Sequence, residues 1–264
     1  MADNHFRVLA PDEPPAVHSY REAGTSDIFI TCDHAGNLIP KRYGTLGLEP
    51  LHLVRHIGWD IGASGLSRRL SDLLDATLFT QTYSRLVIDC NRDLGRPDSI
   101  AKRSEDTDIP GNLGLEPGEA EARAREIFWP YQNAIAAALD ARAAASRRTV
   151  LVAMHSFTPV YHGVSRPWHV GLLYNRDGRM AAILKDLLSE DRALCIGENE
   201  PYAVSDSSDY GIPVHGERRG LPHIEIEMRH DLIETVAHQQ EWAERWADIL
   251  PRAAARLEDC RPTA

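Results

Sequence analysis

The apolar run VLVAM at residues 150–154 constrains the fold more than any other stretch of the chain. Five consecutive apolar residues predict a strand buried on both faces, because a strand with one face in water alternates apolar and polar side chains. Ser156 and Pro159 follow and are typical of a loop, so we expect the strand over residues 149–154 to stop just before His155. The sheet must therefore be covered on both faces, with a histidine where it ends.

Strand-like and helix-like patterns alternate along the rest of the chain. The strand-like segments are residues 27–32, 77–82, 85–90, 169–174 and 223–229. Helical spacing of apolar residues covers 59–76, 116–146 with a break near Pro130, 180–188 and a closing segment up to Leu257. Strands that alternate with helices predict an α/β fold, and 264 residues are compatible with one domain over residues 1–264.

Composition and charge narrow the class of protein. The net charge is -10, so nucleic acid phosphates are repelled on average and small molecules are the expected partners. No segment approaches the length of a membrane span and no signal-peptide core is present, so we expect a soluble, cytoplasmic protein with no membrane partner; the oligomeric state stays open.

Neither a P-loop, a G-x-G-x-x-G motif nor a G-x-S-x-G elbow occurs. The cysteines form no C-x-x-C pair, which argues against disulfides and a cysteine zinc site: Cys32, Cys90, Cys195 and Cys260.

Polar side chains follow three of the predicted strands. His34 comes just after residues 27–32, Asn91 and Arg92 come just after residues 85–90, and His155 ends the apolar run. Ligands of α/β sheets bind beyond the carboxyl ends of the strands, so we expect these side chains to meet at one rim. For each histidine taken alone, the simpler interpretation is a loop histidine that is hydrogen-bonded to backbone.

Asp60 falls near the N-terminus of the predicted helix at residues 59–76. The simplest interpretation of an aspartate at this position is a helix cap. Together with His34 and His155, however, it would supply the three protein ligands of an open catalytic zinc site.

The segment HIEIEMR at residues 223–229 alternates with period two, which puts Glu225 and Glu227 on the same face of a strand. For Glu225 we expect an edge strand with the carboxylate in water, since carboxylates are rarely buried without a partner. Glu227 lies nearer the strand end, where it could take a proton from a water at the metal as a general base.

Two arginines flank the apolar run LVIDCN. Arg85 and Arg92 each offer a guanidinium fork that matches a substrate carboxylate. For Arg85, a surface salt bridge is an equally simple interpretation.

Taken in order, these segments resemble the N-formylglutamate amidohydrolase family, whose members share a fold with zinc carboxypeptidases. The resemblance spans residues 27–233, and its most specific element is the SRxxxDxNR spacing from Ser84 to Arg92. The motifs that carry it are DHAGNLIP with His34 and Pro40, Asp60, SRLVIDCNRD with Arg85, Asn91 and Arg92, MHSF with His155, and IEMRHDLI with Glu227.

The resemblance implies a carboxypeptidase-like three-layer sandwich with a central mixed, mostly parallel sheet. It also implies a metal-dependent hydrolase with one zinc ion, held by His34, His155 and a third ligand, acting on an amide bond of a small carboxylated substrate. Asp60 is the expected third ligand. Carboxypeptidases instead have a glutamate three residues after the first histidine, and this chain has Asn37 there. An amide is a poorer zinc ligand than a carboxylate, and the choice between the two residues stays open.

The remaining roles also follow from the resemblance. Glu227 matches the catalytic glutamate, Arg85 is assigned to the developing oxyanion, and Arg92 with the neighbouring Asn91 is assigned to the substrate. The expected substrate is a small N-acyl amino acid such as N-formylglutamate. Two alternatives stay open: a non-catalytic carboxylate-binding protein on the same fold, and a hydrolase of another N-acyl amino acid or small peptide.

Overall fold

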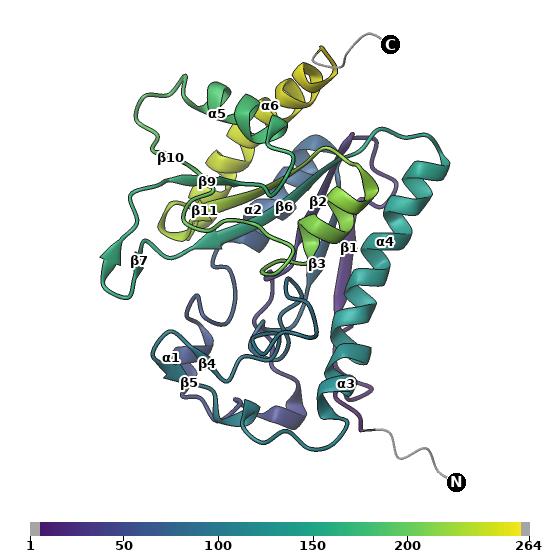
Figure 1. The fold of residues 1–264 in the computed structure, drawn as a ribbon, viewed down its shortest axis with the longest axis vertical. Helices are drawn as coiled ribbons and strands as arrows, with labels where there is room; N and C mark the ends of the chain where they lie inside the picture. The colour runs from purple at the N-terminus through teal and green to yellow at the C-terminus, as the bar shows by residue number, and fades with distance from the viewer. Residues whose placement is uncertain (1–5, 260–264) are drawn as a thin grey trace.

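A central sheet organises the computed structural model of the chain, which describes residues 6–259 (Figure 1). Within those residues the sheet has seven strands, in the spatial order β1 (Val17–Tyr20), β3 (Thr77–Gln81), β2 (Ile28–Cys32), β6 (Val150–Phe157), β11 (His223–Arg229), β9 (Val170–Leu173) and β10 (Ile196–Glu198). The four strands from β3 to β11 are mutually parallel, whereas β1 and the β9–β10 pair run the opposite way. The predicted mixed, mostly parallel sheet is confirmed.

Helices cover both faces of the sheet. One face carries α2 (Ala63–Leu74), α5 (Arg179–Leu188) and α6 (Val236–Asp259), and α4 (Trp129–Ala144) lies along the other (Figure 1). A π-helical turn at Ala124–Phe128 joins α3 (Glu119–Arg123) to α4, so the predicted irregularity near Pro130 is confirmed. The remaining short elements are α1 (Pro50–Leu53), the hairpin of β4 (Arg103–Ser104) with β5 (Thr107–Asp108), the hairpin of β7 (Val160–Tyr161) with β8 (Val164–Ser165), 3-10 turns at Lys41–Tyr43, Pro110–Asn112, Glu217–Arg219 and His230–Leu232, and a π-helical turn at Ile212–Gly216.

Strand β6 shows how the sequence produces this layering. Its side chains alternate between the faces, so Val150, Val152 and Met154 join the core under α2, α5 and α6. Leu151 and Ala153 join the second core, which packs under α4. Both faces are buried, as the apolar run predicts, and each fully buried aliphatic side chain contributes about 1.5 to 3 kcal/mol.

One predicted strand does not form, and another ends later than predicted. Residues 85–90 form a turn and an irregular segment, and their apolar side chains pack in the second core without joining the sheet. Strand β6 does not stop before His155. It continues to Phe157, because β11 extends alongside it and pairs Glu227 with His155 and Arg229 with Phe157.

The expectation for Glu225 is also wrong. Strand β11 lies between β6 and β9 and is not an edge strand, so Glu225 is only 4% exposed. The strand that makes β11 an interior strand is β9, which pairs with it antiparallel.

The described part of the chain bears on the expected absence of a membrane span and on the cysteines. None of its helices is long and apolar enough to cross a membrane. Cys32, Cys90 and Cys195 are unpaired there, and Cys260 lies outside the described residues.

Candidate active site at the carboxyl edge of the sheet

A cavity of about 490 Å³ opens where the parallel strands β2, β6 and β11 end, a size typical of small-molecule sites. The structure brings all of the predicted site residues to its wall: His34, Asp60, Arg85, Asn91, Arg92, His155 and Glu227. Asn37 is half-buried and is not among the lining residues. Segments that lie far apart in sequence therefore meet at one rim.

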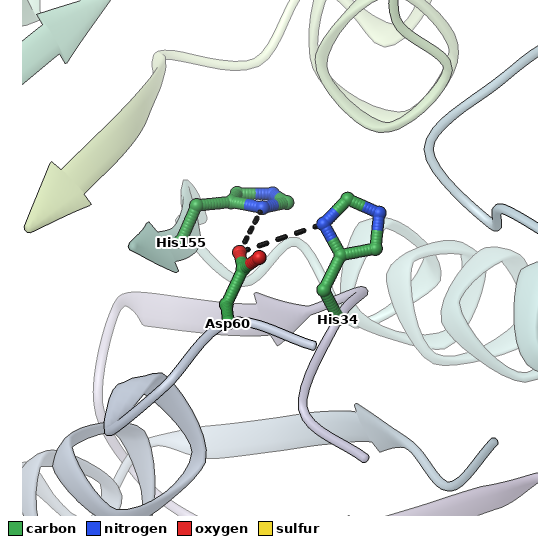
Figure 2. Close-up of side chains that lie close together, drawn as sticks. All are labelled: His34, Asp60 and His155. Carbon is green, nitrogen blue, oxygen red and sulfur yellow. Dashed lines mark hydrogen bonds and ion pairs between the residues drawn. The ribbon is translucent and has the colours of Figure 1, made fainter. Parts of the chain in front are cut away.

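Three buried side chains at the cavity floor could hold a metal ion. One candidate ligand atom from each of His34, Asp60 and His155 lies within 4.8 Å of the other two. Asp60 Oδ2 is 2.9 Å from His155 Nδ1 and 3.4 Å from His34 Nδ1 (Figure 2). Burial opposes ionisation of Asp60, but the positive charge of His34 and the hydrogen bond from His155 outweigh it and lower its pKa. Asp60 stands beside the two histidines, whereas Asn37 does not line the cavity.

The backbone holds each member of this trio. His34 follows β2 by two residues, and its carbonyl accepts a hydrogen bond of 2.9 Å from the Asp60 amide. Asp60 lies just before α2, whose N-cap is Gly62 with a φ of 81°. A Cβ at Gly62 would lie 2.2 Å from the Ile233 carbonyl oxygen, so only glycine allows the chain to pass there. His155 is held by the β6 ladder.

Further carboxylates lie on the outer side of both imidazoles. His34 Nε2 donates to Asp89 Oδ1 at 2.7 Å, and Asp33 Oδ2 lies 3.5 Å from His155 Nε2. Asp33 is held in turn by the Tyr131 hydroxyl at 2.6 Å. Arg85 Nη1 lies 3.2 Å from His34 Nδ1, the ring nitrogen that also faces Asp60. A carboxylate that is hydrogen-bonded behind a histidine, as Asp89 is behind His34, orients that histidine as a metal ligand.

Two glutamates of β11 line the same cavity. Glu225 and Glu227 are both buried, and one carboxylate oxygen of each has no hydrogen-bond partner among the described residues. Burial raises the pKa of each to about 8, against the opposing charge of His155. Glu227 stands opposite His155 in the strand register, whereas Glu225 pairs two residues further back. A carboxyl group that gains or loses its proton near neutral pH thus lies beside the trio on a rigid strand.

The two predicted arginines differ in their surroundings. Arg85 is not a surface salt bridge: its guanidinium lies in the cavity, 2.7 Å from Asp89 and 3.6 Å from Asp60. Arg92 lies further along the wall, 3.4 Å from Asp209 and 3.6 Å from Asp98.

Asn91 connects two loops at the cavity wall. Its side-chain oxygen accepts hydrogen bonds from the Tyr210 and Gly211 amides, and its Nδ2 donates to Asp209 at 3.2 Å. The amide therefore fastens the loop before the Ile212–Gly216 turn to the segment that carries Arg85 and Arg92.

Sequence reasoning missed several residues of this site. Asp33 directly precedes His34, and Asp89 is the aspartate of the SRxxxDxNR spacing. Their place inside these motifs is a sequence signal that could have identified both as site residues. The sequence pattern predicts a solvent-exposed carboxylate for Glu225, whereas the structure buries it at the cavity. Tyr202, which lines the cavity, and Arg166, which donates to the Tyr202 hydroxyl, belong to loops without any comparable pattern.

Comparisons with known proteins agree with this arrangement. A family model described as N-formylglutamate amidohydrolase matches residues 26–234. The crystal structure of a gene product of Agrobacterium tumefaciens is similar at 36% identity and a TM-score of 0.92, covering 96% of this chain and 100% of that chain. An N-formylglutamate amidohydrolase from Ralstonia eutropha JMP134 shares the fold at 18% identity and a TM-score of 0.62, covering 90% of this chain and 99% of that one. No match is found among proteins with curated descriptions. The family model spans well over half of the sequence, and the chain belongs to the N-formylglutamate amidohydrolase family.

Proposed function

We propose that this protein is a zinc-dependent amidohydrolase that cleaves the amide bond of a small N-acyl amino acid, with N-formylglutamate as the first candidate. The observation that carries the proposal is the buried trio of His34, Asp60 and His155 on the floor of a cavity that Glu227 also lines. The family match supports hydrolysis as the reaction class.

The residues present suit a zinc ion. Two imidazoles and one carboxylate form the kind of donor set that leaves a coordination position open in catalytic zinc sites. Asp89, hydrogen-bonded to His34, supplies the outer support that such a ligand requires, and Asp33 lies 3.5 Å behind His155. When bound there, zinc would polarise the scissile carbonyl and lower the pKa of water.

Glu227 is the proposed general base. It is buried at the cavity wall beside His155, with one carboxylate oxygen unpartnered among the described residues. In this role it takes a proton from the attacking water and returns it to the leaving amine. Its β11 backbone is paired on both sides, so the carboxylate needs little reorganisation.

The arginines supply positive charge to the same cavity. We assign Arg85 to the oxygen that gains negative charge as the carbonyl is attacked, because its guanidinium already lies against the trio. Arg92 is assigned to a substrate carboxylate, and Asn91 holds the wall on which Arg92 lies.

A substrate screen tests the proposal. Purified protein with added zinc is assayed against N-formyl amino acids, N-acetyl amino acids and dipeptides, and its bound metal is measured in parallel. We expect fastest turnover of N-formyl-L-glutamate. Faster turnover of the N-acetyl compounds or dipeptides would reassign the substrate, and bound metal without any turnover would contradict the assignment as a hydrolase. Carboxylate binding with neither metal nor turnover would favour the non-catalytic alternative.

A further inference from the structure

The serine of the SRxxxDxNR spacing, Ser84, takes no part in the proposed chemistry, although it opens the most specific sequence element of the chain. Ser84 is only 1% exposed and is not among the residues that line the cavity. Burial of a hydroxyl is unfavourable unless the group is hydrogen-bonded, so its partners show which parts of the chain it holds. These partners belong to different segments.

Ser84 lies where the loop segments that carry site residues meet. Its amide donates to the Leu38 carbonyl at 2.8 Å, four residues after His34. Its hydroxyl donates to the Gly58 carbonyl at 2.7 Å, two residues before Asp60. One residue thus connects the segment that follows β2 with the segment that precedes α2.

The same hydroxyl fixes the start of the segment that carries Arg85. Ser84 Oγ accepts a hydrogen bond of 3.2 Å from the Leu86 amide, and the Ser84 carbonyl accepts one of 2.9 Å from the Val87 amide. Hydroxyls that bond the backbone two residues further on stabilise turns in this way. The Arg85 amide also donates to the Gly58 carbonyl, at 3.3 Å. The Ser84 hydroxyl therefore makes the shorter of these two bonds between the turn and Gly58.

Arg85 is the group whose placement this junction controls. Its guanidinium lies 2.7 Å from Asp89, four residues further along the same segment, and 3.6 Å from Asp60. The first contact stays within the segment, whereas the second crosses to the segment that Ser84 holds through Gly58. The hydroxyl therefore sets how near the arginine stands to Asp60.

Asp60 does not depend on Ser84 for its own position. Its amide donates to the His34 carbonyl at 2.9 Å, and its carboxylate accepts a hydrogen bond of 3.1 Å from the Ser156 amide. Neither bond involves the Ser84 hydroxyl. Loss of that hydroxyl would therefore loosen Arg85 and leave Asp60 in place.

We propose that Ser84 is a positioning residue, which holds Arg85 at its distance from Asp60 so that the guanidinium meets the oxygen that gains negative charge. This inference rests on the proposed function, in which Arg85 stabilises that oxygen. Fixed charge accelerates a reaction only when it already stands where the charge develops, and a misplacement of about 1 Å can lower the rate about 100-fold. Ser84 acts through Arg85, because it does not line the cavity itself.

Kinetics of Ser84→Ala test the proposal with the substrate that the wild type turns over fastest. We expect kcat to fall about 5-fold to 50-fold while KM changes less than about twofold, because Arg85 acts on the transition state. Ser84→Cys fills a similar space with a weaker donor, and it should lose kcat as well. Wild-type kcat in either variant would overturn the proposal.

Ser71→Ala is the matched control. Ser71 is also 1% exposed, and its hydroxyl donates to a backbone carbonyl, that of Ala76, at 2.6 Å, in the last turn of α2. We expect both alanine variants to lose comparable stability in denaturant titrations, but only Ser84→Ala to lose kcat. An equal fall of kcat in Ser71→Ala would attribute the effect to lost stability and overturn the proposal.

A double-mutant cycle decides whether Ser84 acts through Arg85. In the Arg85→Met background the guanidinium is already absent, so Ser84→Ala should lower kcat by less than about twofold. The same fold loss in both backgrounds would mean that the serine acts independently of the arginine, against the proposal. Zinc per protein in Ser84→Ala should equal that of the wild type. A lower zinc content would mean that Ser84 supports the trio instead, which also contradicts the proposal.

The position of Arg85 gives a readout that needs no turnover. In a crystal structure of Ser84→Ala, Arg85 Nη1 should lie beyond salt-bridge distance of Asp60, about 4 Å, compared with 3.6 Å when the hydroxyl is present. An unchanged separation would overturn the proposal. Should the wild type hydrolyse no N-acyl amino acid while Arg85 still moves in Ser84→Ala, the proposed function fails and the role of Ser84 in placing Arg85 stands.

Discussion

Glu227 and His155 occupy the same register position of the neighbouring parallel strands β11 and β6. The opposite neighbour of Glu227 is Gly171 of β9, where an added Cβ would lie 3.1 Å from the Glu227 Cβ. The candidate base and a candidate metal ligand are thus placed by strand pairing and not by flexible loops. Such placement limits the conformational freedom that each side chain would otherwise lose during catalysis.

Replacing Glu227 should remove turnover without removing metal. Glu227→Gln keeps the side-chain volume but cannot accept the proton, so we expect kcat to fall about 100-fold to 10,000-fold. Zinc per protein, measured by mass spectrometry, should stay at the wild-type level because the trio is intact.

Glu225→Gln is the matched control for this variant. Glu225 lies on the same strand face and is equally buried, but it pairs with Ala153, two residues before His155. We expect a much smaller fall in kcat. Normal activity of Glu227→Gln, or an equal loss in both variants, would refute the assignment of the base.

Loss of either histidine of the trio should lower zinc content. His34→Ala and His155→Ala each remove one of three candidate ligands, and we expect both purified proteins to bind zinc far more weakly than the wild type. His18→Ala, an exposed histidine on β1, is the control. Wild-type zinc content in both site variants would show that the metal is held elsewhere.

Asp89→Asn tests the outer support of His34. The Asp89 carboxylate accepts from His34 Nε2 at 2.7 Å and from Arg85 at 2.7 Å, and an amide replaces its charge with a weaker acceptor. We expect zinc affinity to fall about 10-fold to 100-fold in competition with a chromogenic chelator. Unaltered affinity would mean that Asp89 serves only to hold Arg85.

His215 should make stability depend on pH. The residue is buried, its Nε2 donates to Gln132 at 2.7 Å, and burial lowers its pKa from 6.5 to about 4. Between these values the unfolded chain binds a proton that the folded chain does not, so the free energy of unfolding falls as the pH falls. Its contribution is fully present above pH 6.5 and is lost down to about pH 4.

Denaturant titrations measure this effect directly. Between about pH 7 and about pH 5, His215→Gln should lose about 2 kcal/mol less stability than the wild type does. His18→Gln serves as the exposed control and should follow the wild type. An identical pH dependence in wild type and His215→Gln would contradict the prediction.

The trio could be predicted from sequence because its positions depend on local patterns. A histidine just after an apolar strand, one at the end of another and an aspartate before a helix all project toward the same edge of a parallel sheet. The α/β class follows from the same patterns. The expectation of one domain over residues 1–264 stays a prediction.

The remaining features depend on contacts between distant segments. Residues 85–90 have the composition of a strand, but their apolar side chains are buried against helices, and periodicity cannot distinguish the two cases. Glu225 is buried on β11, which is an interior strand because β6 and β9 pair with it from either side. Arg166 and Tyr202 meet across 36 residues of chain in loops that no local pattern specifies.

The most direct test of the account is formate release from N-formyl-L-glutamate by one preparation in three states: zinc-loaded, stripped by a chelator, and reloaded with zinc. Metal content is measured in each state. The account predicts turnover in the first state, its loss in the second and its return in the third. Undiminished turnover by the stripped protein, or none by the zinc-loaded protein, would contradict it.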